Sequence, residues 1–195
     1  MRLILVRHGK PDETQTQRAH DPSLASIGQT QANAVAKILA RETITHIVSS
    51  PLQRAMDTAA PLAESTGLPV QVLHGWAEAD RSATRYRSME TLKAQGPQEW
   101  QRFLQDPITY LGADPDTFRR EVLAALDATI HLAPQGTVAV FTHGMPINLV
   151  LAHVLGTNSL VQFAPDYCSI TRLRASSCQA MSVVSVNELS HKEKF

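Results

Sequence analysis

Short runs of consecutive aliphatic residues recur along this chain, and they constrain its fold more than any other feature. Residues 3–6 read Leu-Ile-Leu-Val, and the stretches "ITHIVSS" (44–50) and "GTVAVFTHG" (136–144) contain similar runs. An apolar run without alternation is typical of a strand whose two faces are both buried, as in a parallel sheet. A sheet of such strands needs helices on both faces, because neither face can be left in water.

The segments between these runs supply the helices. Apolar residues recur in them three and four positions apart, which is the spacing of one face of an α-helix. Pro51 and Pro146 fall near two predicted first turns, and Gly156 falls at a predicted end. Asp114 or Asp116 is a suitable amino-terminal cap for another helix. The predicted helices cover residues 27–42, 51–66, 114–133 and 145–156.

The remaining segments complete the sheet with weaker patterns. A short strand is predicted over residues 69–73, and two strands joined by a turn over residues 169–175 and 180–189. Residues 75–112 are less regular, with one helix predicted over residues 89–104. The alternation of strands and helices predicts the α/β class. We expect a three-layer α/β/α sandwich with a mostly parallel sheet, with room for an antiparallel edge strand near the end.

Composition restricts the compartment and the classes of partner. A hydrophobic fraction of 43% over 195 residues predicts a single domain spanning residues 1–195. Lys+Arg and Asp+Glu both number 18, so no net charge attracts nucleic acid or an anionic membrane. Cys168 and Cys178 are too few for a disulfide framework, and no run approaches the ~20 apolar residues of a membrane span. We expect a cytoplasmic protein without signal peptide, nucleic-acid partner or membrane partner.

Two predicted strands end in similar words, "VRHG" and "FTHG", each of which places a histidine before a glycine. Because the carboxyl ends of parallel strands meet at one edge of a sheet, His8 and His143 are expected to lie together there. Arg7 precedes His8, and "SSPLQRAMDTA" places Arg54 in the first turn of the helix after the second strand. Two guanidiniums and two imidazoles in one crevice are costly to bury unless an anion binds between them.

These words together resemble the signature of the histidine phosphatase superfamily, the phosphoglycerate mutase-like group with an Arg-His-Gly motif. "LVRHGK", "SSPLQRAMDTA" and "FTHG" match in order and spacing, and "LASIGQTQA" is similar to a further family segment. The resemblance covers residue 3 to about residue 155. It implies a phosphoglycerate mutase-like fold, a small phosphorylated substrate and no metal or other cofactor.

The resemblance also implies a role for each residue. His8 is expected to be the nucleophile that takes the phosphoryl group as phosphohistidine. Arg7, Arg54 and His143 are expected to bind the non-bridging phosphate oxygens, where charge develops in the transition state. The amino terminus of the helix after Gly144 is expected to add its positive end. Glycines 9 and 144 are expected to let the backbone approach the phosphate.

The leaving oxygen also needs a general acid. The family places a glutamate after the third strand, where "GWAEADRS" offers Glu78, with Asp80 as a rival two residues later. If this segment is extended, both side chains point the same way. The carboxyl must be protonated near pH 6 to 7, which requires the bound phosphate to raise its pKa more than nearby arginines lower it. Arg81 opposes such a rise, and the Trp-Glu-Gly word that often follows in the family is missing.

Other charged residues have simpler interpretations. Arg81, Arg85 and Arg87 either contact an anionic remainder of the substrate or form an exposed, solvated segment. The remaining histidines show no zinc-ligand spacing, so no metal site is predicted. These histidines are His20, His46, His74, His131, His153 and His191.

Three functions fit these observations. The first is a metal-independent phosphoric monoester hydrolase of the histidine acid phosphatase type, acting on a small metabolite. Glu78 and His143 are only 65 positions apart (143 minus 78), whereas related mutases tend to carry longer insertions there. The second is a phosphoprotein phosphatase or a phosphoglycerate-type mutase. The third is a non-catalytic phosphate-binding or interaction protein. The substrate and the oligomeric state are not predicted.

Overall fold

The computed structural model describes residues 1–189 and has the predicted α/β architecture around one six-stranded sheet. Residues 190–195 of the predicted domain, His191 among them, lie outside the described part of the chain. The order across the sheet is β3-β2-β4-β1-β5-β6. The strands are β1 Arg2–Arg7, β2 His46–Ser49, β3 Val70–Val72, β4 Thr137–Thr142, β5 Ile170–Ser177 and β6 Ala180–Glu188.

The first four strands in this order are parallel, whereas β5 and β6 are both antiparallel to their neighbours. The expected antiparallel edge strand is therefore a pair of strands. β5 lies inside the sheet beside β1, and β6 forms the edge. A two-residue turn between Ser177 and Ala180 joins them, which suits an antiparallel pair.

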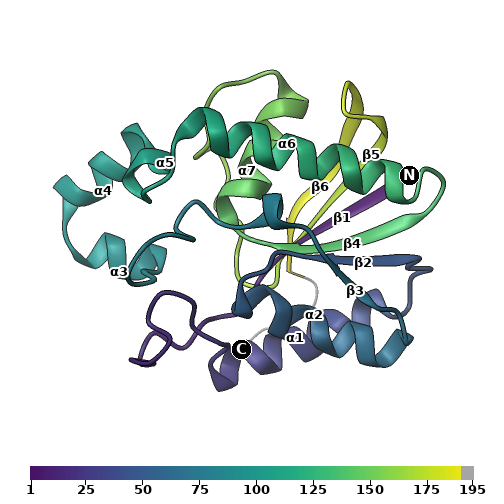
Figure 1. Ribbon diagram of the computed structural model, residues 1–195, viewed down its shortest axis with the longest axis horizontal. Coiled ribbons are helices and arrows are strands. Elements are labelled where there is room, and N and C mark those ends of the chain that lie inside the picture. The colour runs from purple at the N-terminus through teal and green to yellow at the C-terminus, as the bar shows by residue number, and fades with distance from the viewer. Residues whose placement is uncertain (190–195) are drawn as a thin grey trace.

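Helices cover both faces of the sheet, as the unbroken apolar strands require (Figure 1). Leu3 and Leu5 of β1 face a core that includes residues of α6 and α7, and Ile4 and Val6 face a second core with residues of α1 and α2. Successive side chains of a strand point to opposite faces, so one strand contributes to both cores. The four principal helices are α1 Ser26–Leu39, α2 Gln53–Thr66, α6 Pro115–Leu132 and α7 Gly144–Leu155.

The helix boundaries follow the sequence signals with two corrections. Asp114 caps α6 by accepting a hydrogen bond from the Thr117 N–H at 2.8 Å, and Gly156 ends α7 in the left-handed region. Pro51, however, lies outside α2, because Leu52 is the extended residue before its first turn. The single helix predicted over residues 89–104 is also wrong.

Gly96 breaks that predicted helix. Its φ of 111° is unfavourable for a residue with a side chain, and Pro97 then starts a new helix. Residues 89–110 therefore form three short helices, which lie beyond the carboxyl ends of β1, β2 and β4 (Figure 1). They are α3 Met89–Ala94, α4 Pro97–Gln105 and α5 Pro107–Tyr110, and a 3-10 turn, His74–Trp76, follows β3.

Candidate active site

The register between β1 and β4 places His8 beside His143. Arg7 is the partner of Thr142 in the parallel ladder, so each histidine is one residue beyond the paired ends. The His8 N–H donates to the Thr142 carbonyl at 2.9 Å, and the two imidazole centroids are 5.0 Å apart. The side chains are buried, with relative exposures of 2% for His8 and 0% for His143. The predicted meeting of the two histidines is what the structure shows.

Both predicted arginines reach the same place. Arg54 is the second residue of α2 and is fully buried; its Nη2 donates to Asp80 Oδ1 at 2.8 Å, and its Nη1 is 3.5 Å from Asp21 Oδ1. Arg7 Nη1 donates to the Pro165 carbonyl at 2.6 Å. Acceptors from loops thus hold both guanidiniums, one for Arg7 and two for Arg54.

The environment of His8 sets both its tautomer and its charge. Nδ1 lies 2.8 Å from the Gly9 carbonyl oxygen. A carbonyl oxygen only accepts, so Nδ1 carries the ring proton and Nε2 keeps its lone pair. Burial, together with the charges of Arg54 and Arg7, lowers the pKa of His8 well below its usual value. The ring is therefore neutral at pH 7, with Nε2 available as a nucleophile.

His143 is also neutral for similar reasons. Burial lowers its pKa most, and the charge of Arg54 is the next cause. Its Nε2 is 2.7 Å from Ser50 Oγ, and this Oγ accepts a hydrogen bond from the Leu52 N–H at 3.2 Å. This serine follows β2 directly, so the end of β2 joins the ends of β1 and β4 at the same edge of the sheet.

Glu78 is held at the amino terminus of α7. Its Oε2 accepts from the Met145 N–H at 3.2 Å, and its Oε1 accepts from the Ala79 N–H at 3.0 Å. Burial, followed by the negative charge of Asp80, raises the pKa of Glu78 from 4.5 to about 7. The two N–H donors and Arg54 oppose this rise without cancelling it. The expected condition, that a bound phosphate must raise the pKa more than the arginines lower it, is not needed, because burial already raises the pKa.

Asp80 and Glu78, the two candidates for the general acid, occupy different positions. The segment is a turn and not an extended strand, because the Arg81 N–H donates to the Glu78 carbonyl at 3.2 Å. Asp80 is 5% exposed and forms an ion pair with Arg54, while Glu78 contacts the helix α7. The two carboxyls therefore reach one site from the first and third residues of a turn, with separate partners.

Several buried nitrogen atoms in this site have no hydrogen-bond partner within residues 1–189. They are Arg7 Nε, Arg54 Nε, Arg54 Nη1 and His143 Nδ1. A buried donor without a partner costs about 1–3 kcal/mol, so such atoms are rare unless a ligand uses them. Their concentration beside the lone pair of His8 Nε2 suits an anion with several acceptor oxygens.

The two glycines differ in their surroundings. A Cβ on Gly9 would lie 2.7 Å from the Gly28 carbonyl oxygen, so Gly9 is needed for the close packing of the loop after β1 against α1. A Cβ on Gly144 would meet only Glu78 Oε2, at 3.8 Å. The approach of the backbone to phosphate at these two glycines stays a prediction.

The basic cluster lies outside this constellation. Arg81, Arg85 and Arg87 are exposed, which fits either interpretation. Arg81 pairs with Glu121 of α6 at 2.7 Å. Arg85 and Arg87 line an open pocket of about 450 Å³ with Tyr110, away from the buried histidines.

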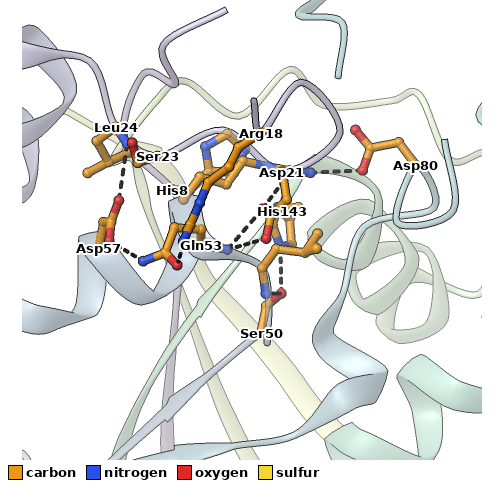
Figure 2. Close-up of polar contacts among 12 residues, drawn as sticks. His8, Arg18, Asp21, Ser23, Leu24, Ser50, Gln53, Asp57, Asp80 and His143 are labelled. Carbon is orange, nitrogen blue, oxygen red and sulfur yellow. Dashed lines mark hydrogen bonds and ion pairs between the residues drawn. The ribbon is translucent and has the colours of Figure 1, made fainter. Parts of the chain in front are cut away.

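Sequence reasoning missed several residues that support the site. Ser50 is one, although its place at a strand end is a signal that could have identified it. Asp21 is another: its two carboxylate oxygens accept from the Gln53 N–H at 2.9 and 3.0 Å, which caps α2 beside Arg54 (Figure 2). Tyr86 and Tyr167, whose rings contact Arg54 and Arg7, come from loops that carry no recognisable motif.

Metal ligands, membrane spans and disulfides can each be assessed for residues 1–189. Within this range, no group of three or more His, Cys, Asp or Glu side chains is arranged to hold a metal ion. No helix in the same range is long and apolar enough to span a membrane. Cys168 is buried next to the backbone of His8, and Cys178 lies in the turn between β5 and β6. No disulfide joins these two cysteines.

Comparison with known proteins agrees with this geometry. Over 198 aligned residues the chain is 33% identical to the bifunctional protein Rv2228c of Mycobacterium tuberculosis, covering 97% of this chain and 54% of that protein. The chain thus spans about half the length of this relative. It is 29% identical to the probable phosphoglycerate mutase GpmB of Yersinia enterocolitica, covering 80% of this chain and 75% of that protein.

A solved structure has the same fold. It is the mycobacterial glucosyl-3-phosphoglycerate phosphatase Rv2419c, with a TM-score of 0.75, 23% identity and coverage of 95% of this chain and 98% of that one. The family model of the histidine phosphatase superfamily (branch 1) matches residues 3–188, which is nearly the whole chain. The chain belongs to the histidine phosphatase superfamily.

Proposed function

We propose that this protein is a phosphatase that hydrolyses phosphomonoesters of a small metabolite through a phosphohistidine on His8. The observation that carries the proposal is the set of partnerless buried nitrogens on Arg7, Arg54 and His143 beside His8 Nε2. Guanidinium edges donate two parallel hydrogen bonds to a phosphate group, which suits them to this position. Two permanent positive charges also match a phosphate dianion, so the proposed reaction uses no metal.

In the first step, the lone pair of His8 Nε2 attacks phosphorus and the bond from phosphorus to the leaving oxygen breaks. The His8 ring is prepared for this, because its Nδ1 proton is held by the Gly9 carbonyl at 2.8 Å. Arg7, Arg54 and His143 donate to the non-bridging oxygens as charge develops on them. His143 can donate from Nδ1 when Ser50 donates its hydroxyl proton to Nε2.

Glu78 is the proposed acid. Its pKa of about 7 keeps much of the carboxyl protonated at neutral pH, and the leaving oxygen takes that proton. In the second step, water gives its proton to the Glu78 carboxylate and attacks phosphorus, and the phosphorus–nitrogen bond breaks. This step releases inorganic phosphate and returns His8 and Glu78 to their starting states.

Two alternatives differ from this scheme after the phosphate has bound. A mutase or a phosphatase of phosphoproteins would use the same phosphohistidine, and one relative of this chain is named a probable phosphoglycerate mutase. A phosphate-binding protein would bind the anion without turnover. The proposal favours hydrolysis of small esters in the cytoplasm, because the chain has neither a disulfide framework nor a long insertion between Glu78 and His143.

The proposal is tested by hydrolysis assays on wild type, His8→Ala and Glu78→Gln, with a chelator present. The substrates are 4-nitrophenyl phosphate, whose leaving group needs little protonation, and glycerol phosphate, whose leaving group needs a proton. We expect His8→Ala to lose both activities by at least about a thousandfold and Glu78→Gln to lose mainly the second. Full activity of His8→Ala contradicts the nucleophile, and a wild type without activity on any ester favours the binding protein. Transfer to added glycerate indicates the mutase.

The pH dependence tests the acid separately. Because the pKa of Glu78 is raised to about 7, its carboxyl is protonated below that pH and loses the proton as pH rises. We expect kcat/KM for glycerol phosphate to fall above about pH 7, while that for 4-nitrophenyl phosphate changes little. An identical fall for both esters would contradict Glu78 as the proton donor.

A further inference from the structure

Two tyrosines cover the proposed nucleophile. The ring centroid of Tyr167 is 5.7 Å from that of His8, and the centroid of Tyr86 is 6.3 Å from it. The tyrosines are 8% and 6% exposed, respectively, and their side chains interact with each other. His8 is therefore enclosed by a side-chain contact between two loops, one after β3 and the other before β5.

Each ring also lies against one phosphate-binding arginine. The guanidinium carbon of Arg7 is 4.3 Å from the Tyr167 centroid, and that of Arg54 is 4.6 Å from the Tyr86 centroid. The tyrosines therefore cover the flat faces of both guanidiniums, and the edges remain for hydrogen bonds. When a phosphate binds at these edges, its ester group must point toward solvent. Two routes are open to it: past the tyrosines, or past a second contact between the surrounding loops.

The other contact joins the loop after β1 to the start of α3, and it is the stronger of the two. Glu13 Oε2 accepts from Thr91 Oγ1 at 2.9 Å and from the Ser88 N–H at 3.4 Å, and the Tyr86 N–H donates to the Ala19 carbonyl at 2.6 Å. Backbone groups take part in two of these bonds. Opening this contact requires movement of the main chain.

Opening the tyrosine contact requires only side-chain rotation. The bond that its hydroxyls make within residues 1–189 is a long one of 3.4 Å from Tyr167 Oη to Glu90 Oε2. The backbone beneath Tyr167 is fixed, because the next N–H, that of Cys168, donates to the Arg7 and His8 carbonyls at 3.0 and 3.3 Å. The exit route that needs the smallest movement of the protein therefore lies between the two tyrosine rings.

We propose that Tyr86 and Tyr167 determine substrate specificity, by forming a gate between their rings that admits narrow leaving groups and excludes wide ones. This inference rests on the proposed function, since it concerns the leaving group of the ester attacked by His8. The gate predicts that esters with a narrow group on the phosphate oxygen, such as primary alkyl or single-ring esters, are substrates. Fused-ring and highly branched esters are predicted to be excluded.

The test compares phenyl phosphate with 1-naphthyl phosphate, two aryl esters that differ mainly in width. The quantity measured is the ratio of kcat/KM for the naphthyl ester to that for the phenyl ester. Tyr167→Leu shortens one side of the gate and is expected to raise this ratio at least fivefold. Thr91→Val is the matched control, because it removes a hydrogen bond from the other contact with almost no change of shape, and its ratio is expected to stay within twofold of wild type.

A second variant keeps the test valid if Tyr167→Leu is poorly folded, which circular dichroism would show. Tyr86→Phe keeps the ring and removes only the hydroxyl, so both esters are expected to react at least as fast as with wild type. A fall of both rates below a third of wild type would mean that the hydroxyl takes part in the reaction, which contradicts a gate.

The outcomes separate the gate from the proposed function. A ratio in folded Tyr167→Leu within twofold of wild type, or an equal rise in Thr91→Val, overturns the gate while the His8-dependent activity stands. Undiminished hydrolysis of phenyl phosphate by His8→Ala, or none by wild type, overturns the proposed function and the gate with it.

Discussion

The proposed chemistry depends on single atoms that are buried without partners. Arg54 shows this best, because it is fully buried, yet Asp80 binds only its Nη2 while Nε and Nη1 have no hydrogen-bond partner. Asp80 thus fixes the guanidinium while two of its buried donors make no hydrogen bond within residues 1–189, although Nη1 lies 3.5 Å from Asp21 Oδ1. This arrangement is useful only if an anion binds there.

Replacement of Arg54 by lysine tests the role of the guanidinium directly. Arg54→Lys keeps the positive charge but loses the planar pair of donors, so we expect kcat/KM for 4-nitrophenyl phosphate to fall by about a hundredfold. Arg81→Lys is the control, because Arg81 is exposed and paired with Glu121, and its activity is expected to stay within about twofold. Steady-state kinetics with both variants decides the matter, and equal activities would show that Arg54 does not bind the phosphate.

Some of these residues can be predicted from the sequence, and others cannot. His8, His143 and Arg54 follow from the ends of strands, because a parallel sheet gathers those ends at one edge. The partners Asp80 and Tyr86 come from an irregular segment, where no periodicity places a side chain. The raised pKa of Glu78 depends on burial by loops, which is a tertiary property.

Among the elements, the loop after β1 depends on its packing against α1. A Cβ on Gly28 would lie 2.1 Å from the Lys10 carbonyl oxygen and 2.9 Å from the Lys10 nitrogen. Both are backbone atoms, so no side chain can move aside to make room. The helix and the loop that carries His8 therefore touch through their main chains.

Gly28→Ala tests this contact. In an ordinary helix this change stabilises by up to about 1 kcal/mol, but here the backbone must shift, and we expect a net loss of about 1–3 kcal/mol. Gln29→Ala, at an exposed position of the same helix, is the control with little expected change. Urea unfolding at equilibrium measures both. A Gly28→Ala protein as stable as wild type would contradict the close approach.

The elements themselves were largely predictable, with an instructive exception. Long periodic segments such as α6 and the buried strand β4 are found within a few residues of their predicted places. The helix predicted over residues 89–104 failed because Gly96 and Pro97 end one helix and begin another, and this dipeptide outweighs the apolar spacing around it.

For the whole molecule, the sheet explains how distant residues form one site. Two apolar cores hold the sheet between helix layers (Figure 1), and Tyr86 from the loop after β3 and Tyr167 from the loop before β5 cover His8. The architecture followed from the sequence because unbroken apolar strands demand cover on both faces. The closure of the site did not, because it depends on contacts between loops far apart along the chain, such as Glu13 with Thr91.

The central claim is that the phosphoryl group passes through His8. Mass spectrometry of the protein, quenched with alkali during turnover of 4-nitrophenyl phosphate and then digested, tests it most directly. The account predicts one phosphoryl group on the peptide that contains His8, located on the His8 ring by fragmentation, and none in His8→Ala. A phosphoryl group on any other residue, or turnover with His8 unmodified at every quench time, would contradict it.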